Sequence, residues 1–133
     1  MFDFQGNIEA LNSEKGTYML FIYLKNNINV IVSRKKFMLK KGYYIYVGSA
    51  FGNGGIKARV KRHLRKQKRI HWHIDHITGT EESEIIAIAL ATEQQVECII
   101  SSILSSINDV TPIFGFGNTD CKDHCESHLF FIN

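Results

Sequence analysis

The sequence predicts a single small α+β domain, with an antiparallel three-stranded sheet flanked by helices, an extra hairpin and a C-terminal extension. Apolar residues alternate in the first half of the chain, as in strands, whereas two later stretches repeat them at helical spacing. The chain has 133 residues and is 44% hydrophobic, which suffices for one core but not for two domains. We expect one domain over 1–133, with a core at about 16–107 and a C-terminal cap at 108–133.

The first strands are predicted from two extended runs, GTYMLFIYL at 16–24 and INVIVS at 28–33. Asn26 and Asn27 between them tolerate a turn, so the two runs are expected to pair as a hairpin. The next segment, SRKKFMLKKG, is expected to be a basic link, and Tyr43 to Val47 to form the third strand. The first and third strands each place a tyrosine beside a glycine, in GTY and YVG.

A helix is predicted for IKARVKRHLRKQ, after the glycine-rich connection SAFGNGG. Ile56, Val60 and Leu64 form a narrow apolar stripe on this helix. Arg59 and His63 are expected at the rim of the stripe, neither wholly buried nor freely solvated.

The second half of the sequence predicts a strand, a helix and a final strand. HWHIDHIT is either a helical turn or the start of a strand, with Trp72 in the core, and SEIIAIALA reads as a buried strand. Thr92 followed by Gln95 resembles a capping box that starts a helix running to about 107. The residues expected on its apolar face are Val96, Ile99, Ile100, Ile103, Leu104 and Ile107. Glu97 falls at the edge of this face, and the final run Leu129–Ile132 is expected as an edge strand.

The basic residues are concentrated in one segment. Between Lys57 and Arg69 lie eight of the sixteen Lys and Arg residues, with no acid among them. Such a cationic face usually meets a polyanion or serves solubility, and we favour a nucleic acid. The residues expected to contact it are Ser49, Lys57, Lys61, Arg62, Arg65, Lys66, Arg69, His71 and His73.

A cytoplasmic protein is predicted, with no membrane association. No apolar stretch approaches the roughly 20 residues of a membrane span, and the first residues lack the plan of a secretory signal. The three cysteines are an odd number and too few for a disulfide scaffold, which fits a reducing compartment.

The C-terminal cysteines allow two interpretations. Cys121, Cys125 and His128 have a spacing close to that of structural zinc sites, but the fourth ligand is open among His124, Asp120 and a distant residue. Buried cysteines packed in a C-terminal cap are the interpretation that we favour. The cluster of His71, His73, Asp75 and His76 follows no known metal-site spacing, so we expect it to bind phosphate, or no ligand, rather than zinc.

The ordered set of these motifs resembles the GIY-YIG nuclease domain. Gly16-Thr17-Tyr18 stands for its first signature and Tyr46-Val47-Gly48 for its second, while Arg59 and Glu97 occupy the places of its arginine and glutamate. GYYIYVGSA, HWHID and the terminal DC…SHLF resemble a small, little-characterised subgroup of that family, a domain of unknown function. Thr17 replaces the usual isoleucine, which should matter little, and Ser49 stands where DNA-repair members often have lysine.

The resemblance implies a metal-dependent endonuclease that cleaves DNA and selects DNA structure rather than sequence. RNA is another candidate substrate. A protein partner is a further candidate for directing the enzyme to its cleavage site. Glu97 would hold Mg²⁺ or Mn²⁺, Arg59 would clamp the scissile phosphate, and Tyr18 or Tyr46 would orient or deprotonate water. His63 would hydrogen-bond a tyrosine or the phosphate. Both tyrosine hydroxyls are expected to face one cleft with Arg59 and Glu97.

Two other functions remain open from the sequence. A non-catalytic DNA- or RNA-binding module could have kept the same fold, and Ser49 in place of lysine motivates that alternative. A zinc-binding interaction protein is a third hypothesis, which depends only on the C-terminal cysteines and histidine.

Overall fold

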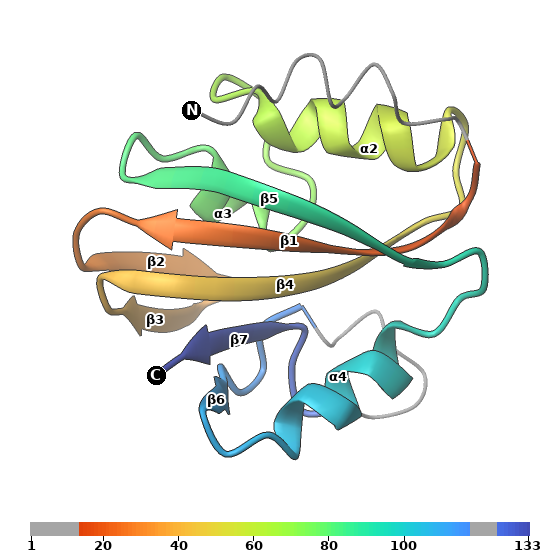
Figure 1. Cartoon of the computed structure of the whole chain (residues 1–133). Helices are drawn as coiled ribbons and strands as arrows, with labels where there is room; N and C mark the ends of the chain where they lie inside the picture. The colour runs from red at the N-terminus through yellow and green to blue at the C-terminus, as the bar shows by residue number, and fades with distance from the viewer. Residues whose placement is uncertain (1–13, 118–124) are drawn as a thin grey trace.

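The structure, a computed structural model, describes residues 14–117 and 125–133, apart from the side chains of 90–92. The described residues form an α+β fold with a mostly antiparallel sheet and few helices (Figure 1). Within this part of the chain, no helix is long and apolar enough to span a membrane.

The main sheet has five strands in the order β5-β1-β4-β7-β6. Its central strand β1 pairs antiparallel with both β4 and β5, and β4 in turn pairs with β7. The strand bounds are β1 Gly16–Leu24, β4 Gly42–Ala50, β5 Ser83–Thr92, β6 Val110–Pro112 and β7 Leu129–Ile132. The strand predicted at 129–132 is therefore present, but it lies inside the sheet and β6 forms the edge.

The predicted pairing of 16–24 with 28–33 is wrong. Instead β2 (Ile28–Val32) pairs with β3 (Lys35–Leu39) in a separate two-stranded sheet. Ser33 and Arg34 between them take positive φ values of 50° and 70°, as a tight two-residue hairpin turn requires. The lysines of β3 conceal its alternation in the sequence, because Phe37 and Leu39 are buried while Lys35 and Lys36 are exposed.

Helices cover both faces of the main sheet (Figure 1). The inward face of α2 (Gly55–Leu64) contributes Ile56 and Val60 to a core that also contains Leu20 of β1. The short α3 (Asp75–Thr78) contributes Ile77 to the same core. On the opposite face, α4 (Glu97–Ser105) packs Leu104 in a second core.

The helix predicted from Thr92 to about 107 begins only at Glu97, and the face that it buries differs from the predicted one. Thr92 belongs to β5, where its backbone pairs with Thr17 of β1, so it does not cap a helix. The buried residues of α4 are Cys98, Ser101 and Leu104. The predicted apolar face is therefore wrong in part, since Ile99 and Ile103 are 59% and 58% exposed.

Candidate functional site

A pocket of about 460 Å³ lies where the end of β4, α2 and the start of α4 approach one another. It is lined by Tyr46, Gly48, Ser49, Arg59, His71, Trp72, Gln95, Glu97, Gly117 and His128. Three of the predicted catalytic residues, Tyr46, Arg59 and Glu97, thus line one pocket although they belong to three different elements. Ser49 and His71 of the predicted nucleic-acid contacts line it too.

The two tyrosine–glycine motifs interlock across the sheet. Tyr18 of β1 lies opposite Gly48 of β4 in the strand register. A Cβ atom on Gly48 would come within 2.7 Å of the Tyr18 hydroxyl oxygen and 2.9 Å of the Tyr46 ring. Only glycine leaves room for both aromatic rings at this position.

Tyr18 does not line the pocket, contrary to the expectation that both hydroxyls face it. Its hydroxyl lies 2.6 Å from Nε2 of His63, and both side chains are fully buried. His63 is therefore not at the rim of its helix as predicted. Its position follows from α2, where it shares the inward face with Ile56 and Val60. Tyr18 and His63 are therefore packed together in the core beside Gly48.

Burial keeps both members of this pair uncharged. Burial raises the pKa of Tyr18 well above its ordinary value, and the neighbouring Tyr46 raises it further. Burial also lowers the pKa of His63 to about 3, with Lys68 as the next largest cause. A neutral phenol and a neutral imidazole thus share one hydrogen bond, whose direction follows from the tautomer of His63.

Arg59 is held at the pocket by an aromatic ring. Its guanidinium carbon lies 3.7 Å from the centroid of the Trp72 ring, and that of Arg62 lies 4.3 Å from the same centroid. Stacking on an indole restricts the orientation of a guanidinium without neutralising its charge. Trp72 thus positions Arg59 at the pocket as well as packing against the core.

Arg62 has an internal partner. Its two terminal nitrogens donate to the two carboxylate oxygens of Asp75 at 2.7 and 2.8 Å. Asp75 also accepts the backbone N–H groups of His71 and Trp72 at 2.9 Å each. Burial raises the pKa of Asp75, but Arg62 and these N–H groups outweigh it and lower the pKa to about 2. This ion pair fixes the 71–72 segment of the pocket wall.

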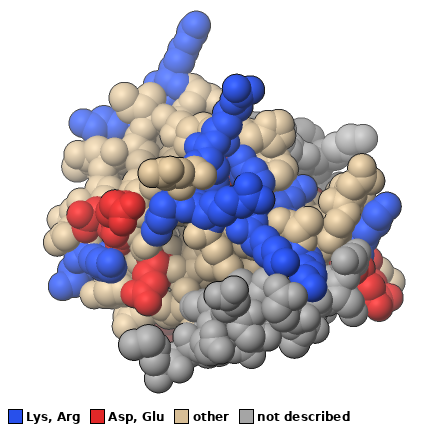
Figure 2. All heavy atoms as spheres, turned by 90° about the horizontal axis from the view of Figure 1, so that it is seen from above, with Lys and Arg blue, Asp and Glu red and all other residues tan. Residues whose placement is uncertain are grey.

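The other predicted nucleic-acid contacts fall into two groups. Lys66 donates to Thr80 O at 2.7 Å, and His73 Nδ1 accepts the N–H of Gly117 at 3.0 Å, so both have internal partners. The exposed members are Lys61, Arg65 and Arg69, while Lys57 is half-buried. Figure 2 shows Lys and Arg side chains gathered on the face that lies uppermost in Figure 1, where α2 runs.

Glu97 begins α4 and is half-buried at the pocket. Its Oε2 atom is buried, and no hydrogen-bond partner lies within reach among the described residues. Leaving a buried carboxylate oxygen without a partner costs free energy, which a bound cation would offset. Oxygen ligands of this kind suit Mg²⁺ or Mn²⁺.

Thr17 is a site residue that the sequence analysis missed. Its Oγ1 donates to the carbonyl of Gln94 at 2.7 Å and accepts the N–H of Val96 at 3.1 Å. These two bonds fix the backbone just before Glu97. The sequence does contain a hint of this role, because Thr17 is a hydroxyl residue in an otherwise apolar strand and stands where the GIY-YIG signature usually has isoleucine.

A second cluster, defined by Cys98, Cys125 and His128, lies beside the pocket, which His128 also lines. The three side chains are buried, and their ligand atoms lie within 4.8 Å of one another. Of the predicted zinc ligands, Cys121 lies outside the described residues. Cys98, which the sequence did not associate with the others, joins the cluster from α4.

Comparison with known protein families gives a match over most of the chain. A family profile described as domain of unknown function DUF123 matches residues 17–133. No curated protein and no solved structure matches the chain.

Proposed function

The chain belongs to the family described as domain of unknown function DUF123, and because that description assigns no activity, we propose from its pocket that it is a metal-dependent nuclease of GIY-YIG type. The reaction would be hydrolysis of phosphodiester bonds in DNA, with RNA as the second candidate. One observation carries the proposal: Tyr46, Arg59 and Glu97 line the same pocket. The antiparallel order β5-β1-β4, with α2 and α4 on opposite faces, supports the GIY-YIG arrangement.

Glu97 would hold Mg²⁺ or Mn²⁺ through its unpartnered carboxylate oxygen. When bound, such an ion supplies positive charge against the phosphoryl oxygens and makes water more acidic. One protein carboxylate leaves most of the coordination shell to water and phosphate, which is usual for Mg²⁺.

Arg59 would bind the scissile phosphate. A guanidinium donates two parallel N–H bonds to phosphate oxygens, so it fixes the orientation of the group and opposes the charge that develops on it. Because Trp72 already restricts this guanidinium, less conformational entropy is lost when the phosphate binds.

Tyr46 would orient the attacking water. Of the two motif tyrosines, only Tyr46 lines the pocket. Tyr18 is sealed against His63, and its raised pKa opposes ionisation. We therefore assign Tyr18 and His63 to positioning of the strand ends, and Tyr46 to contact with the reacting groups.

The cationic face would supply affinity for the nucleic-acid backbone. Lys61, Arg65 and Arg69 are exposed, and contacts from such residues to phosphates are sensitive to salt but do not read bases. Selectivity for branched, flapped or nicked structures would then exceed selectivity for sequence.

The test is a cleavage assay on plasmid, flapped and branched DNA, and on matched RNA, with Mg²⁺ or Mn²⁺. We expect Glu97→Gln, Arg59→Lys and Tyr46→Phe each to lower kcat by about 100-fold or more, because each removes a group that acts in the transition state. Their matched controls are Glu93→Gln, Arg34→Lys and Tyr43→Phe, since Glu93, Arg34 and Tyr43 are exposed and do not line the pocket. The controls should stay within about twofold.

Two results would contradict the proposal. Metal-dependent cleavage that survives Glu97→Gln would remove Glu97 from the site. Salt-sensitive binding without cleavage of any substrate would favour the non-catalytic module, a rival that the exposed Lys61, Arg65 and Arg69 also support.

A further inference from the structure

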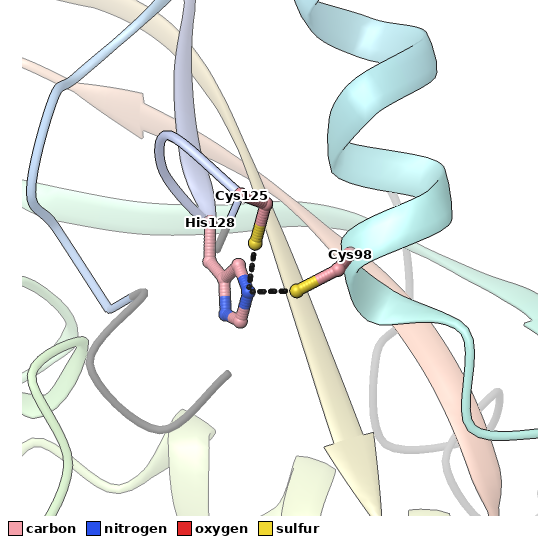
Figure 3. Close-up of side chains that lie close together, drawn as sticks. All are labelled: Cys98, Cys125 and His128. Carbon is pink, nitrogen blue, oxygen red and sulfur yellow. Dashed lines mark hydrogen bonds between the residues drawn. The ribbon is translucent and has the colours of Figure 1, made fainter. Parts of the chain in front are cut away.

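We propose that Cys98, Cys125 and His128 form a zinc site in the reduced protein, independent of the proposed nuclease activity. In Figure 3 the two sulfur atoms point at the same nitrogen of the His128 ring. Cys125 Sγ lies 3.1 Å from His128 Nε2, and Cys98 Sγ lies 3.6 Å from it. All three residues are buried.

The distances suit a tetrahedral metal ion. Zinc binds thiolate sulfur at about 2.3 Å and imidazole nitrogen at about 2.0 Å, so tetrahedral angles place sulfur roughly 3.5 Å from nitrogen. The same geometry separates two sulfur ligands by roughly 3.8 Å. The observed 3.1 and 3.6 Å, with all atoms within 4.8 Å, lie close to these values.

Hydrogen bonding alone explains the convergence poorly. A ring nitrogen of neutral imidazole offers either one N–H or one lone pair, yet two sulfur atoms approach Nε2 of His128. Thiols are also weak donors and weak acceptors. A cation between the three atoms would use the lone pair and both sulfurs at once.

The backbone already holds the histidine in place. The N–H of His128 donates to Phe116 O and its carbonyl accepts the N–H of Val47, both at 2.9 Å. Cys98 lies in the first turn of α4, and Cys125 lies in the segment before β7. A metal here would join α4 to the sheet and fix the turn that carries Glu97.

The ligand chemistry selects zinc. Two thiolates and an imidazole are soft and intermediate ligands, which favour Zn²⁺ over Mg²⁺ or Ca²⁺. Cys98 is disulfide-bonded in this structure, whereas Cys125 is not part of a disulfide. Because zinc requires thiolates, the proposal applies to the reduced chain, and a disulfide at Cys98 is the competing state.

The test measures metal in the full chain, purified with a phosphine reductant and without chelators. Mass spectrometry of the metal content should find about one zinc per chain, since a structural site saturates at one ion. Co²⁺ exchanged into the site should show the intense visible bands of a tetrahedral ion and charge-transfer bands from thiolate. Cys98→Ser, Cys125→Ser and His128→Ala should each bring the zinc content close to zero.

The control for His128→Ala is His76→Ala, a histidine of α3 away from the cluster, and it should keep its zinc. If the serine variants fail to fold, the Co²⁺ spectrum of the unaltered chain still shows whether a tetrahedral thiolate site is present. Zinc-free reduced protein that shows no tetrahedral Co²⁺ bands would overturn the proposal. So would a Cys98 disulfide that persists in the reductant, found as a cross-linked Cys98 peptide when the protein is digested without further reduction.

Discussion

At the scale of single residues, Tyr18 and His63 form a hydrogen-bonded pair of titratable side chains inside the core. Their 2.6 Å hydrogen bond is fully buried, and Nδ1 of His63 has no partner within the described residues. A buried imidazole with an unpartnered nitrogen opposes protonation, which agrees with the pKa of about 3.

This pair makes folding sensitive to moderate acid. The pKa of His63 is about 3 in the folded protein and 6.5 ordinarily, so between these pH values the unfolded chain binds the proton and the folded chain does not. Stability from this residue is therefore intact above pH 6.5 and falls by up to about 1.4 kcal/mol per pH unit below it. We expect His63→Gln to remove this dependence.

Urea unfolding at several pH values from 7 to 4 checks the prediction. The stability difference between the unaltered protein and His63→Gln should shrink as the pH falls, whereas His76→Gln should show no such trend. A difference that stays constant over this range would mean that His63 binds its proton equally well in the folded and the unfolded protein, which would contradict the lowered pKa.

At the scale of elements, the start of α4 is set by a contact from another element. The cap residue Val96 provides no side-chain hydrogen bond. Its N–H instead donates to Thr17 of β1, whose hydroxyl also binds Gln94 O. The position of Glu97 thus depends on a strand that lies 77 to 79 residues earlier in the sequence.

Thr17→Val keeps the shape of the side chain but leaves the Gln94 carbonyl and the Val96 N–H without this partner. We expect a loss of about 1–3 kcal/mol in the free energy of unfolding. Under the proposed function, cleavage should fall as well, because the carboxylate of Glu97 is displaced. Thr111→Val, the same change at an exposed position of β6, should leave both nearly unaltered. Equal stability of Thr17→Val and Thr111→Val would contradict this account.

The elements show what local sequence can predict. The period of two in GTYMLFIYL and the stripe of Ile56 and Val60 identified β1 and α2, because their apolar residues do pack on one core. The pairing of β2 with β3 was missed, since a turn through Ser33 and Arg34 has none of the usual glycine or asparagine. The orientation of α4 was missed because its Ile99 and Ile103 stay exposed.

The site was predictable only in outline. Tyr46, Arg59 and Glu97 were expected from the resemblance of their ordered motifs to the GIY-YIG domain, and they line one pocket. The roles of Thr17 and Cys98 depend on contacts between distant elements, which no local spacing encodes. Burial of His63 was missed because helical spacing placed it on the flank of the stripe of Ile56, Val60 and Leu64, whereas it lies on the inward face.

At the scale of the whole molecule, the C-terminal segment is an integral part of the sheet. The short β7 lies between β4 and β6, and Leu129 and Phe130 are fully buried. Alternate residues of this strand serve opposite faces, with Leu129 in the core under α2 and Phe130 in the core under α4. The segment after residue 107 thus contributes β6 and β7 to the same sheet as the earlier strands.

Phe130→Ala should accordingly destabilise the entire fold. Truncation of a buried phenylalanine removes its burial and leaves a cavity, which together cost about 3–5 kcal/mol. Phe114→Ala is the matched control, because Phe114 is 60% exposed. Thermal and urea unfolding should show one cooperative transition shifted only by Phe130→Ala. A separate early transition would show instead that the last strand unfolds by itself.

Gly48, which packs against the rings of both Tyr18 and Tyr46, shows that the two tyrosine–glycine motifs are needed for the fold independently of any chemistry. Gly48 makes room for the rings of Tyr18 and Tyr46, and Tyr18 is bound to His63 away from the pocket. A descendant of this chain that lost Arg59, Glu97 and every activity would still need glycine there to fold around both rings. The tripeptides alone therefore identify an architecture, and the side chains at the pocket have to be inspected before a relative is assigned any chemistry.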